Sequence, residues 1–292
     1  MPSGRQQLKA KTQHYLPCVY LKQFSADGLN ATRKSKVWRL DPTICVEVPV
    51  DSQCSDNYFY TKADSALAEE QFHELEQQYG LIARKIRQGQ TRTPEEDYRL
   101  ILMMFDIHLR NRMYTNQTGN ENFEAYKIRW SAFRSEILLP GAVSNPTDAE
   151  VLDHLKNSWR VQLLQVNEQF ELATSDNPSL WFSIDNSSSL HFVVLPITPA
   201  CCAVAFDVRC IRVHENKLSC RDTFNLNRHQ ICHSQGALYS SKKPTPEEKE
   251  MIIGEWHKRE KPGGSTTDKK WTVNLLRWRG RDHLSFLVEP GH

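Results

Sequence analysis

The sequence predicts an α+β fold, in which mixed or antiparallel β elements from both ends of the core flank a helical region. Three observations support this class: two short alternating segments near the N-terminus, helical patterning over about residues 63–169, and a series of short β-rich segments after it. Of the 292 residues, 39% are hydrophobic and 25% are charged, which is ordinary for a soluble globular protein.

The first two elements form a predicted β-hairpin. KVWRLDP (36–42) and ICVEVPV (44–50) alternate apolar and polar residues and are separated by a short break. Between residues 63 and 88, apolar residues instead recur at alternating steps of four and three. That spacing predicts a helix with one apolar face.

Three further helices are expected before the β-rich half. Thr93 and Glu96 flank Pro94 in the pattern of a capping box, which predicts a helix start there. A third helix is expected over residues 122–138, before Pro140-Gly141. A fourth is expected to begin at Asn145-Pro146 and to run to about Gln169.

Short β-rich segments separated by turn residues follow, at 170–178, 179–184, 189–199, 201–208 and 210–215. A helix is expected to start near Asn225, and another after a capping pattern at Thr245. WTVNLLRWRG and HLSFLVEP are predicted to close the chain as a hairpin. Residues 1–241 are predicted to form the core, and residues 242–292 a basic, Trp-containing C-terminal extension.

Several classes of protein are disfavoured by what the sequence lacks. No apolar run is long enough for a membrane span, and the N-terminal residues lack the apolar region of a signal peptide. We therefore expect a cytoplasmic protein without a membrane partner, whose eight cysteines are reduced thiols. The absence of GxGxxG, GxxxxGK[ST] and GxSxG argues against a Rossmann dinucleotide site, a P-loop and a common α/β-hydrolase.

Three ordered stretches carry a resemblance to a known family. They are QHYLPCVYLKQF followed by VWRLD, ATSDNP followed by VVLPITP, and FNLNRHQICHSQGALYSS. Their order and spacing over residues 13–241 resemble the domain-of-unknown-function (DUF) family 4238. The resemblance implies an α+β domain in a mostly bacterial, soluble group, and it supplies no biochemical activity.

By motif position, the resemblance points to His14, Tyr15, Ser175, Asp176, Asn177 and Asn225. The family's second helix usually has an RTP-like pattern, whereas this chain has HLRNRMY. The resemblance therefore assigns no role to Arg110 or Arg112.

The motif residues predict a candidate acid/base site. His14 and Tyr15 exchange protons and stand next to a backbone that Pro17 restricts, and Asp176 stands in a turn before Pro178. Asn177 or Asn225 would orient the substrate. Such a set suits a hydrolase acting on nucleic acid or another phosphate ester, either without metal or with Asp176 supplying one ligand to Mg²⁺.

The same residues also fit a structural role in a non-catalytic module that binds nucleic acid or protein. TSDNP is typical of an Asx turn, and Asn225 would serve as a helix N-cap. His14 would then donate to a backbone carbonyl and hold the N-terminal segment in place.

A zinc site is the second candidate, and the sequence does not favour it. His229 and Cys232 are spaced i, i+3 on an expected helix, with His233 adjacent and Cys220 and His214 upstream. Tetrahedral zinc needs four such ligands, but neither CxxC nor HExxH is present. Cys232 fits an apolar helix face equally well.

Basic ends around an acidic middle make nucleic acid a candidate partner. Residues 1–37 hold seven Lys or Arg against one Asp, and residues 242–281 hold eleven against six acidic residues. Cations bind phosphates and aromatic rings stack on bases. In the extension, the candidate nucleic-acid-binding residues are Trp256, Lys269, Lys270, Trp271, Arg277, Trp278 and Arg279. Alternatively, these tryptophans pack within a hairpin and the basic residues form solvated ends.

Overall fold

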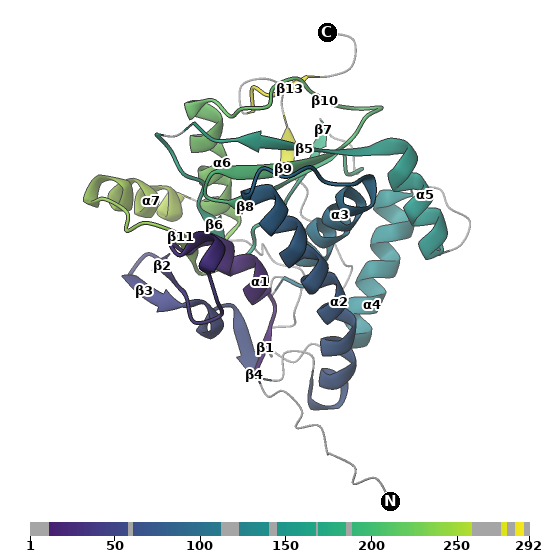
Figure 1. The fold of residues 1–292 in the computed structure, drawn as a ribbon, viewed down its shortest axis with the longest axis horizontal. Coiled ribbons are helices and arrows are strands. Elements are labelled where there is room, and N and C mark those ends of the chain that lie inside the picture. Colours follow the sequence, from purple (N-terminus) through teal and green to yellow (C-terminus); the bar gives the residue numbers. More distant parts are fainter. Residues whose placement is uncertain are drawn as a thin grey trace, which may run out of the picture.

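A five-stranded sheet buried on both faces organises the computed structural model (Figure 1). The structure describes residues 12–57, 61–111, 123–139, 145–167, 169–184, 189–258, 276–278 and 284–288. The sheet has the order β12, β7, β8, β9, β5, formed by Leu276–Trp278, Leu180–Ile184, Phe192–Thr198, Cys201–Asp207 and Trp159–Gln165. β12 pairs with β7 in parallel and the other pairs are antiparallel.

The central strands are apolar because both of their faces are covered. All seven residues of β8 and all seven of β9 are buried. In β8, Val193 and Leu195 belong to the larger core, whereas Phe192 and Val194 belong to a second core on the opposite face. Two-sided burial explains why VVLPI and CCAVAF are continuous apolar runs rather than alternating ones.

Helices cover these two faces separately. The larger core contains residues of α1 (Cys18–Leu21), α2 (Thr61–Arg87), α3 (Pro94–Leu109), α4 (Phe123–Ala132) and α5 (Asp148–Ser158). The second core contains Leu226 of α6 (Cys220–His233). In Figure 1, α2 to α5 accordingly lie together, while α6 and α7 (Pro246–Lys258) lie on the other side.

A smaller sheet is joined to this body. It has the order β3, β2, β11, β6, formed by Cys45–Pro49, Lys36–Leu40, Leu238–Ser240 and Thr174–Ser175. Two ribbons complete the described β structure: β1 (Thr12–His14) with β4 (Ser55–Asn57), and β10 (Arg212–Val213) with β13 (Leu287–Val288). Among the described residues, 3₁₀ helices form at Lys22–Phe24, Gly28–Asn30 and Val50–Ser52. The α+β class with mixed and antiparallel strands is confirmed.

Several local predictions are also confirmed. The hairpin forms as β2 and β3, and the first long helix forms as α2. Thr93 accepts from the backbone N–H of Glu96, and the Glu96 carboxylate accepts from the N–H of Thr93, so the capping box is present. The helix expected over 122–138 forms as α4, continued by a π-helix over Phe133–Leu138.

The fourth predicted helix was too long. α5 ends at Ser158, and the chain continues as β5, whose seven residues pair with β9 from Trp159↔Asp207 to Gln165↔Cys201. A ladder with a distant strand outweighs the local helical pattern of this segment. The segment expected as a strand at 170–178 contains only the two-residue β6.

Two predictions for the C-terminal half were wrong. The helix expected near Asn225 begins at Cys220, where Ser219 caps it and accepts from the N–H of Asp222. The last two strands do not pair with each other as a hairpin, because β12 joins β7 and β13 joins β10. Their partners are in earlier parts of the chain, which a local pattern does not reveal.

The described segments after residue 241 pack onto the core. Trp256 of α7 is buried against Leu40, Ile231 and Leu238. Near the C-terminus, Leu284, Phe286 and Leu287 are completely buried in the second core. The Asp222 carboxylate accepts from the N–H and the hydroxyl of Ser285, both at 2.6 Å, so the start of α6 is tied to this last segment.

A buried histidine connects α3 to β7. The His108 ring stacks on Trp181 with 4.1 Å between ring centroids, and its Nδ1–H donates to the carbonyl of Ser179 at 2.9 Å. Burial lowers the pKa of His108 to about 3 and the pKa of His233 to about 4. Both side chains are therefore neutral in the folded protein at pH 7.

We predict that these histidines make the protein less stable in acid. Unfolded histidine titrates near 6.5, so below that pH the unfolded state binds protons that the folded state does not. Each histidine then lowers the free energy of unfolding by up to about 1.4 kcal/mol per pH unit, until the pH reaches its folded pKa. His108→Asn keeps a donor near Nδ1 but cannot be protonated, so its loss of stability between pH 7 and pH 4 should be smaller.

Urea unfolding at each pH measures this difference. The exposed His257→Asn is the matched control and should keep the full pH dependence. Parallel stability curves for the wild type and His108→Asn would contradict the assignment.

Candidate functional site

His14 and Tyr15 are neighbours in the chain but line different cavities. β1 pairs with β4, and the N–H of Tyr15 donates to the carbonyl of Cys54 at 3.0 Å just beyond the paired residues. Successive residues of an extended strand point to opposite sides. His14 consequently lines one cavity, here called the His14 cavity, and Tyr15 lines another, called the Asp176 cavity.

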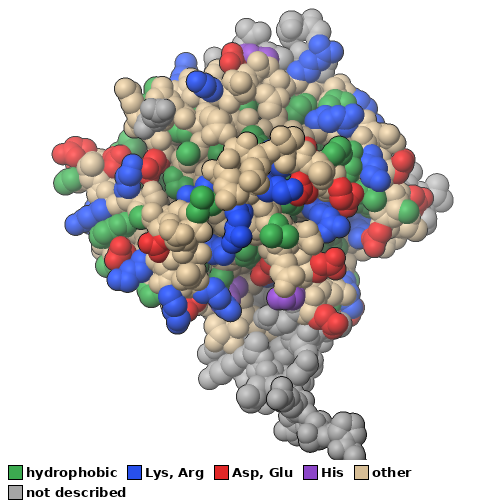
Figure 2. Space-filling model, in the orientation of Figure 1, with side chains coloured by type: hydrophobic (Ala, Val, Ile, Leu, Met, Phe, Trp, Pro, Cys, Tyr) green, Lys and Arg blue, Asp and Glu red, His purple; other side chains and the backbone are tan. Residues whose placement is uncertain are grey.

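The His14 cavity has a volume of about 300 Å³ and is rich in cations. Lys22, Arg33 and Arg110 line it, against the single carboxylate of Glu76. Among the described residues, neither Lys22 nor Arg33 forms an ion pair. Figure 2 shows basic side chains over the middle of the face on which α1 and α2 lie. The cavity therefore favours an anion.

Arg110 is held rigidly at this cavity. Its side chain is 3% exposed and forms ion pairs with Glu76 at 2.8 Å and Asp106 at 3.2 Å. It also donates to the carbonyl of His14 at 2.9 Å and lies over the Phe72 ring, 3.8 Å from its centroid. These contacts fix the backbone of His14 relative to α3.

His14 is a neutral base in this arrangement. Its Nε2 lies 3.2 Å from the carbonyl oxygen of Asp51, and a carbonyl only accepts, so Nε2 carries the proton. Nδ1 is then the acceptor nitrogen. Burial lowers the pKa of His14, and the positive charges of Arg33 and Arg110 lower it further. The imidazole is therefore unprotonated near neutral pH.

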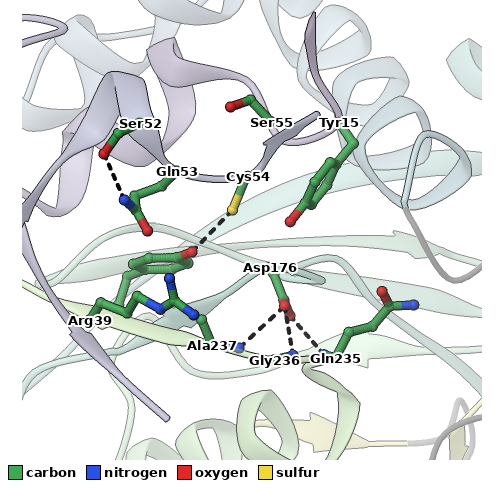
Figure 3. A pocket seen from close by; sticks show the side chains of 11 residues that line it. Tyr15, Arg39, Ser52, Gln53, Cys54, Ser55, Asp176, Gln235, Gly236 and Ala237 are labelled. Atoms are coloured by element: carbon green, nitrogen blue, oxygen red, sulfur yellow. Dashed lines mark hydrogen bonds between the residues drawn. The ribbon is translucent and has the colours of Figure 1, made fainter. Parts of the chain in front are cut away.

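The Asp176 cavity, of about 410 Å³, lies where the smaller sheet meets the loop between α6 and β11 (Figure 3). Asp176 follows β6 and is 6% exposed. Its carboxylate accepts from the backbone N–H groups of Gln235 at 2.8 Å, Gly236 at 2.7 Å and Ala237 at 3.2 Å. These three donors occupy both carboxylate oxygens, which favours a structural role over proton transfer.

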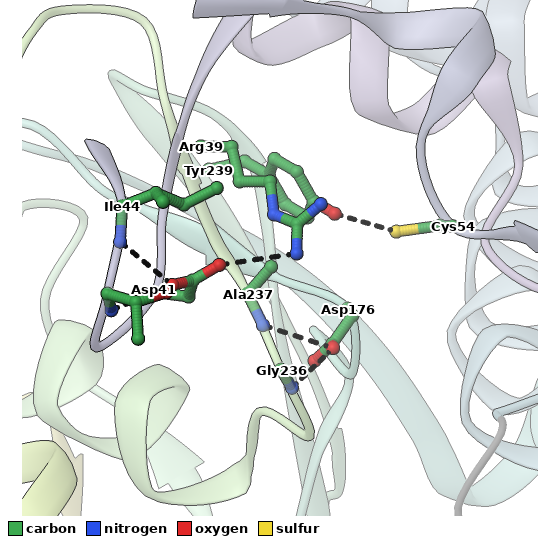
Figure 4. A network of polar contacts seen from close by, with 9 residues as sticks. Arg39, Asp41, Ile44, Cys54, Asp176, Gly236, Ala237 and Tyr239 are labelled. Carbon is green, nitrogen blue, oxygen red and sulfur yellow. Dashed lines mark hydrogen bonds and ion pairs between the residues drawn. The ribbon is translucent and has the colours of Figure 1, made fainter. Parts of the chain in front are cut away.

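Cys54 and Tyr239 form another wall of the Asp176 cavity (Figure 4). The Cys54 thiol and the Tyr239 hydroxyl are 3.3 Å apart. Burial raises the pKa of both groups, and the charge of Asp176 raises each further. Both remain protonated at neutral pH, so Cys54 is not an activated nucleophile.

Arg39 supplies the positive charge at this cavity (Figure 4). It donates to the Asp41 carboxylate at 3.3 Å, while Asp41 also accepts from the N–H groups of Thr43 and Ile44 in the turn between β2 and β3. Burial alone would raise the pKa of Asp41, but these hydrogen bonds and Arg39 lower it. Asp41 is therefore an ionised partner for Arg39.

The match to a family model places this geometry in a known group. The model of a protein family of unknown function, DUF4238, matches residues 12–244. The chain belongs to the DUF4238 family. The match confirms the resemblance seen in the motifs over residues 13–241. No curated protein and no solved structure matches the chain.

The DUF4238 motif residues do not form one site. Tyr15 and Asp176 line the same cavity, but His14 lines the other one, so the expected pairing of His14 with Asp176 is not found. Asn177 is 2% exposed, and its amide donates to the carbonyl of His233 at 3.2 Å. Asn225 is half-buried within α6, where it is not the N-cap, and lines neither cavity.

The candidate nucleic-acid residues of the DUF4238 chain are only partly described. Trp256 is 5% exposed and packs in the core, which corrects the expectation that its ring is open to a base. Arg277 and Trp278 lie in β12, and nothing further is described of their side chains. The other four candidates lie outside the described residues: Lys269, Lys270, Trp271 and Arg279.

Two further features considered from the sequence are a zinc site and a membrane-spanning helix. In these ranges, no three His, Cys, Asp or Glu side chains gather into a metal-binding group. His214 instead places Nε2 2.8 Å from the carbonyl of Ser285. No helix described in the structure has the length and apolar character that crossing a membrane requires.

Sequence analysis missed the residues that complete each cavity. Arg33 stands in the polar loop between the first helical turns and β2, and Cys54 stands just before β4. Cys54 has a left-handed backbone, with φ of 52°, which is uncommon for a residue other than glycine and is not visible in the sequence. The motif HLRNRMY did contain Arg110, but only the fold places it behind His14.

We predict that Asp176→Asn destabilises the fold. The substitution keeps the shape, but the amide nitrogen cannot accept, and one or two backbone N–H donors in the loop at 235–237 lose their partner. Urea unfolding should show a loss of about 1–3 kcal/mol. The exposed Asp27→Asn is the control and should change stability by less than about 0.5 kcal/mol. Equal stability of both variants would show that the three hydrogen bonds contribute little.

Proposed function

We propose that this DUF4238 protein binds a phosphate ester in the His14 cavity. The observation that carries the proposal is the set of three cations, Lys22, Arg33 and Arg110, around one carboxylate and a neutral imidazole. Guanidinium groups match phosphate oxygens in charge and geometry. The ligand class, a nucleic acid or another phosphate ester, is the one that the sequence motifs favoured.

The three cations contribute in different ways. Arg110 is buried and already paired with Glu76 and Asp106, so it serves to fix the cavity wall, and the positive charge open to a ligand comes from Lys22 and Arg33. Arg33 is exposed and Lys22 is half-buried, which allows both to reach an incoming phosphate. A partly enclosed cation strengthens this attraction because the dielectric constant is lower than in water.

Hydrolysis of the bound ester is a second candidate, favoured by the tautomer of His14. With its Nε2–H donating a hydrogen bond to the backbone carbonyl of Asp51, His14 would use its Nδ1 atom as a general base. It would take a proton from water as the water oxygen bonds to phosphorus and the ester oxygen leaves, later protonated by solvent. Asp176 has no part in this step, because its carboxylate accepts three backbone N–H groups elsewhere.

Without that step, the protein is a phosphate-binding module. The alternative stated from the sequence was a different one, a non-catalytic module that binds nucleic acid or protein and in which the motif residues are structural. A nucleotide and a single-stranded oligonucleotide share the phosphate group that the cavity would bind. Comparing the affinity for a nucleoside monophosphate with the affinity for a short single-stranded RNA shows which of these two ligands binds better.

We expect Arg33→Gln to weaken the binding of a nucleoside monophosphate by roughly 10-fold to 100-fold, because a hydrogen bond to a charged group is lost. Isothermal titration calorimetry measures the affinity, which should also fall as salt is raised. The control is Arg84→Gln, an exposed arginine of α2 with no ion pair among the described residues. Equal affinities in the two variants, or no binding by the wild type, would refute the proposal.

For hydrolysis, we expect His14→Gln to lower kcat by about 10²-fold to 10⁴-fold while phosphate binding is retained. In the wild type, the rate should rise with pH and reach half of its maximum below pH 6.5, since the pKa of His14 is lowered from that value. Release of p-nitrophenol from bis-p-nitrophenyl phosphate provides the assay. Binding without turnover at any pH would exclude hydrolysis, and phosphate binding alone would remain as the function.

A further inference from the structure

The Asp176 cavity is not used by the proposed function, and it differs in chemistry from the His14 cavity. We propose that it is a second binding site, which takes a neutral, hydroxyl-rich ligand of the size of a monosaccharide. The two cavities share no lining residue, since His14 lines one and Tyr15 lines the other. The inference therefore stands independently of phosphate binding.

The charged groups that line this cavity already have hydrogen-bonding partners in the protein. Arg39 is paired with the ionised Asp41 (Figure 4), and Asp176 accepts from three backbone N–H groups. A charged ligand would gain little attraction here and would lose its hydration on entering. These existing partners distinguish the cavity from the His14 cavity, and they favour an uncharged ligand.

The remaining polar groups are hydroxyls and amides. Tyr15, Gln53 and Gln235 supply a phenol hydroxyl and two amides, with serine hydroxyls beside them (Figure 3). Tyr239 supplies a second phenol hydroxyl (Figure 4). Each of these groups both donates and accepts hydrogen bonds. A sugar hydroxyl also does both, so a polyol can satisfy this set in several orientations. The tyrosine rings add apolar surface for the C–H groups of a sugar ring.

The cavity is also pre-formed. Its volume of about 410 Å³ falls within the range of roughly 300–1,000 Å³ that small-molecule sites occupy. Cys54 is held in its left-handed conformation, because its carbonyl accepts from the N–H of Tyr15 and its thiol contacts the Tyr239 hydroxyl. Strained residues that the surroundings hold in place are concentrated at functional sites. A rigid wall lowers the entropic cost of binding.

The test uses the full chain and three neutral probes: D-ribose, D-glucose and myo-inositol. We expect at least one to bind by isothermal titration calorimetry, and Gln235→Ala and Tyr15→Phe each to weaken it by up to about 10-fold, the effect of one lost hydrogen bond. Tyr15→Phe preserves the ring, so it remains informative if Gln235→Ala does not fold. The control, Gln88→Ala at the exposed end of α2, should bind like the wild type.

Competition separates this site from the proposed phosphate site. Saturating inorganic phosphate should leave sugar binding unchanged, and Arg33→Gln should leave it unchanged as well. The inference is overturned if none of the three probes binds, if neither cavity variant weakens binding, or if phosphate displaces the sugar. Binding of uracil in place of any sugar would also overturn it, because a planar base rather than a polyol would then be the ligand.

Discussion

The hydrogen bonds from three consecutive backbone N–H groups to the Asp176 carboxylate are the interaction on which this part of the molecule depends. They hold the loop between α6 and β11 against the turn after β6, and the N–H of Asp176 donates back to Ala237 at 3.2 Å. β11 can then pair with both β2 and β6, which completes the smaller sheet. The same three N–H groups stabilise the negative charge of the buried Asp176 carboxylate beside the cavity.

The alternation of the β1 strand explains why one motif contributes to two cavities. His14 faces Lys22, Arg33 and Arg110, whereas Tyr15 faces the small sheet. Adjacent residues on an extended backbone point in opposite directions, so the side chains of His14 and Tyr15 diverge although the residues are neighbours in the sequence. Arg110 donates to the carbonyl of His14 and so fixes the backbone from which the two side chains diverge.

Local patterns in the sequence predicted those elements whose partners are nearby. The β2–β3 hairpin, the long α2 helix and the Thr93 capping box depend on neighbours within a few residues, and all three were found. β5 and β12 depend on pairing with distant strands, and their placement was missed. The candidate site shows the same contrast. The motif residues could be named from the sequence, but Arg33 and Cys54 come to lie beside them only when the chain folds.

The Asp222–Ser285 contact bears on where this chain can be divided. The family match ends at residue 244, yet Leu284, Phe286 and Leu287 fill the second core together with Leu226. A fragment ending at the family boundary would expose Leu226 and its apolar neighbours to water and leave the Asp222 carboxylate without its Ser285 donors. The unit of sequence similarity is thus shorter than the packed unit, which includes the described residues 284–288.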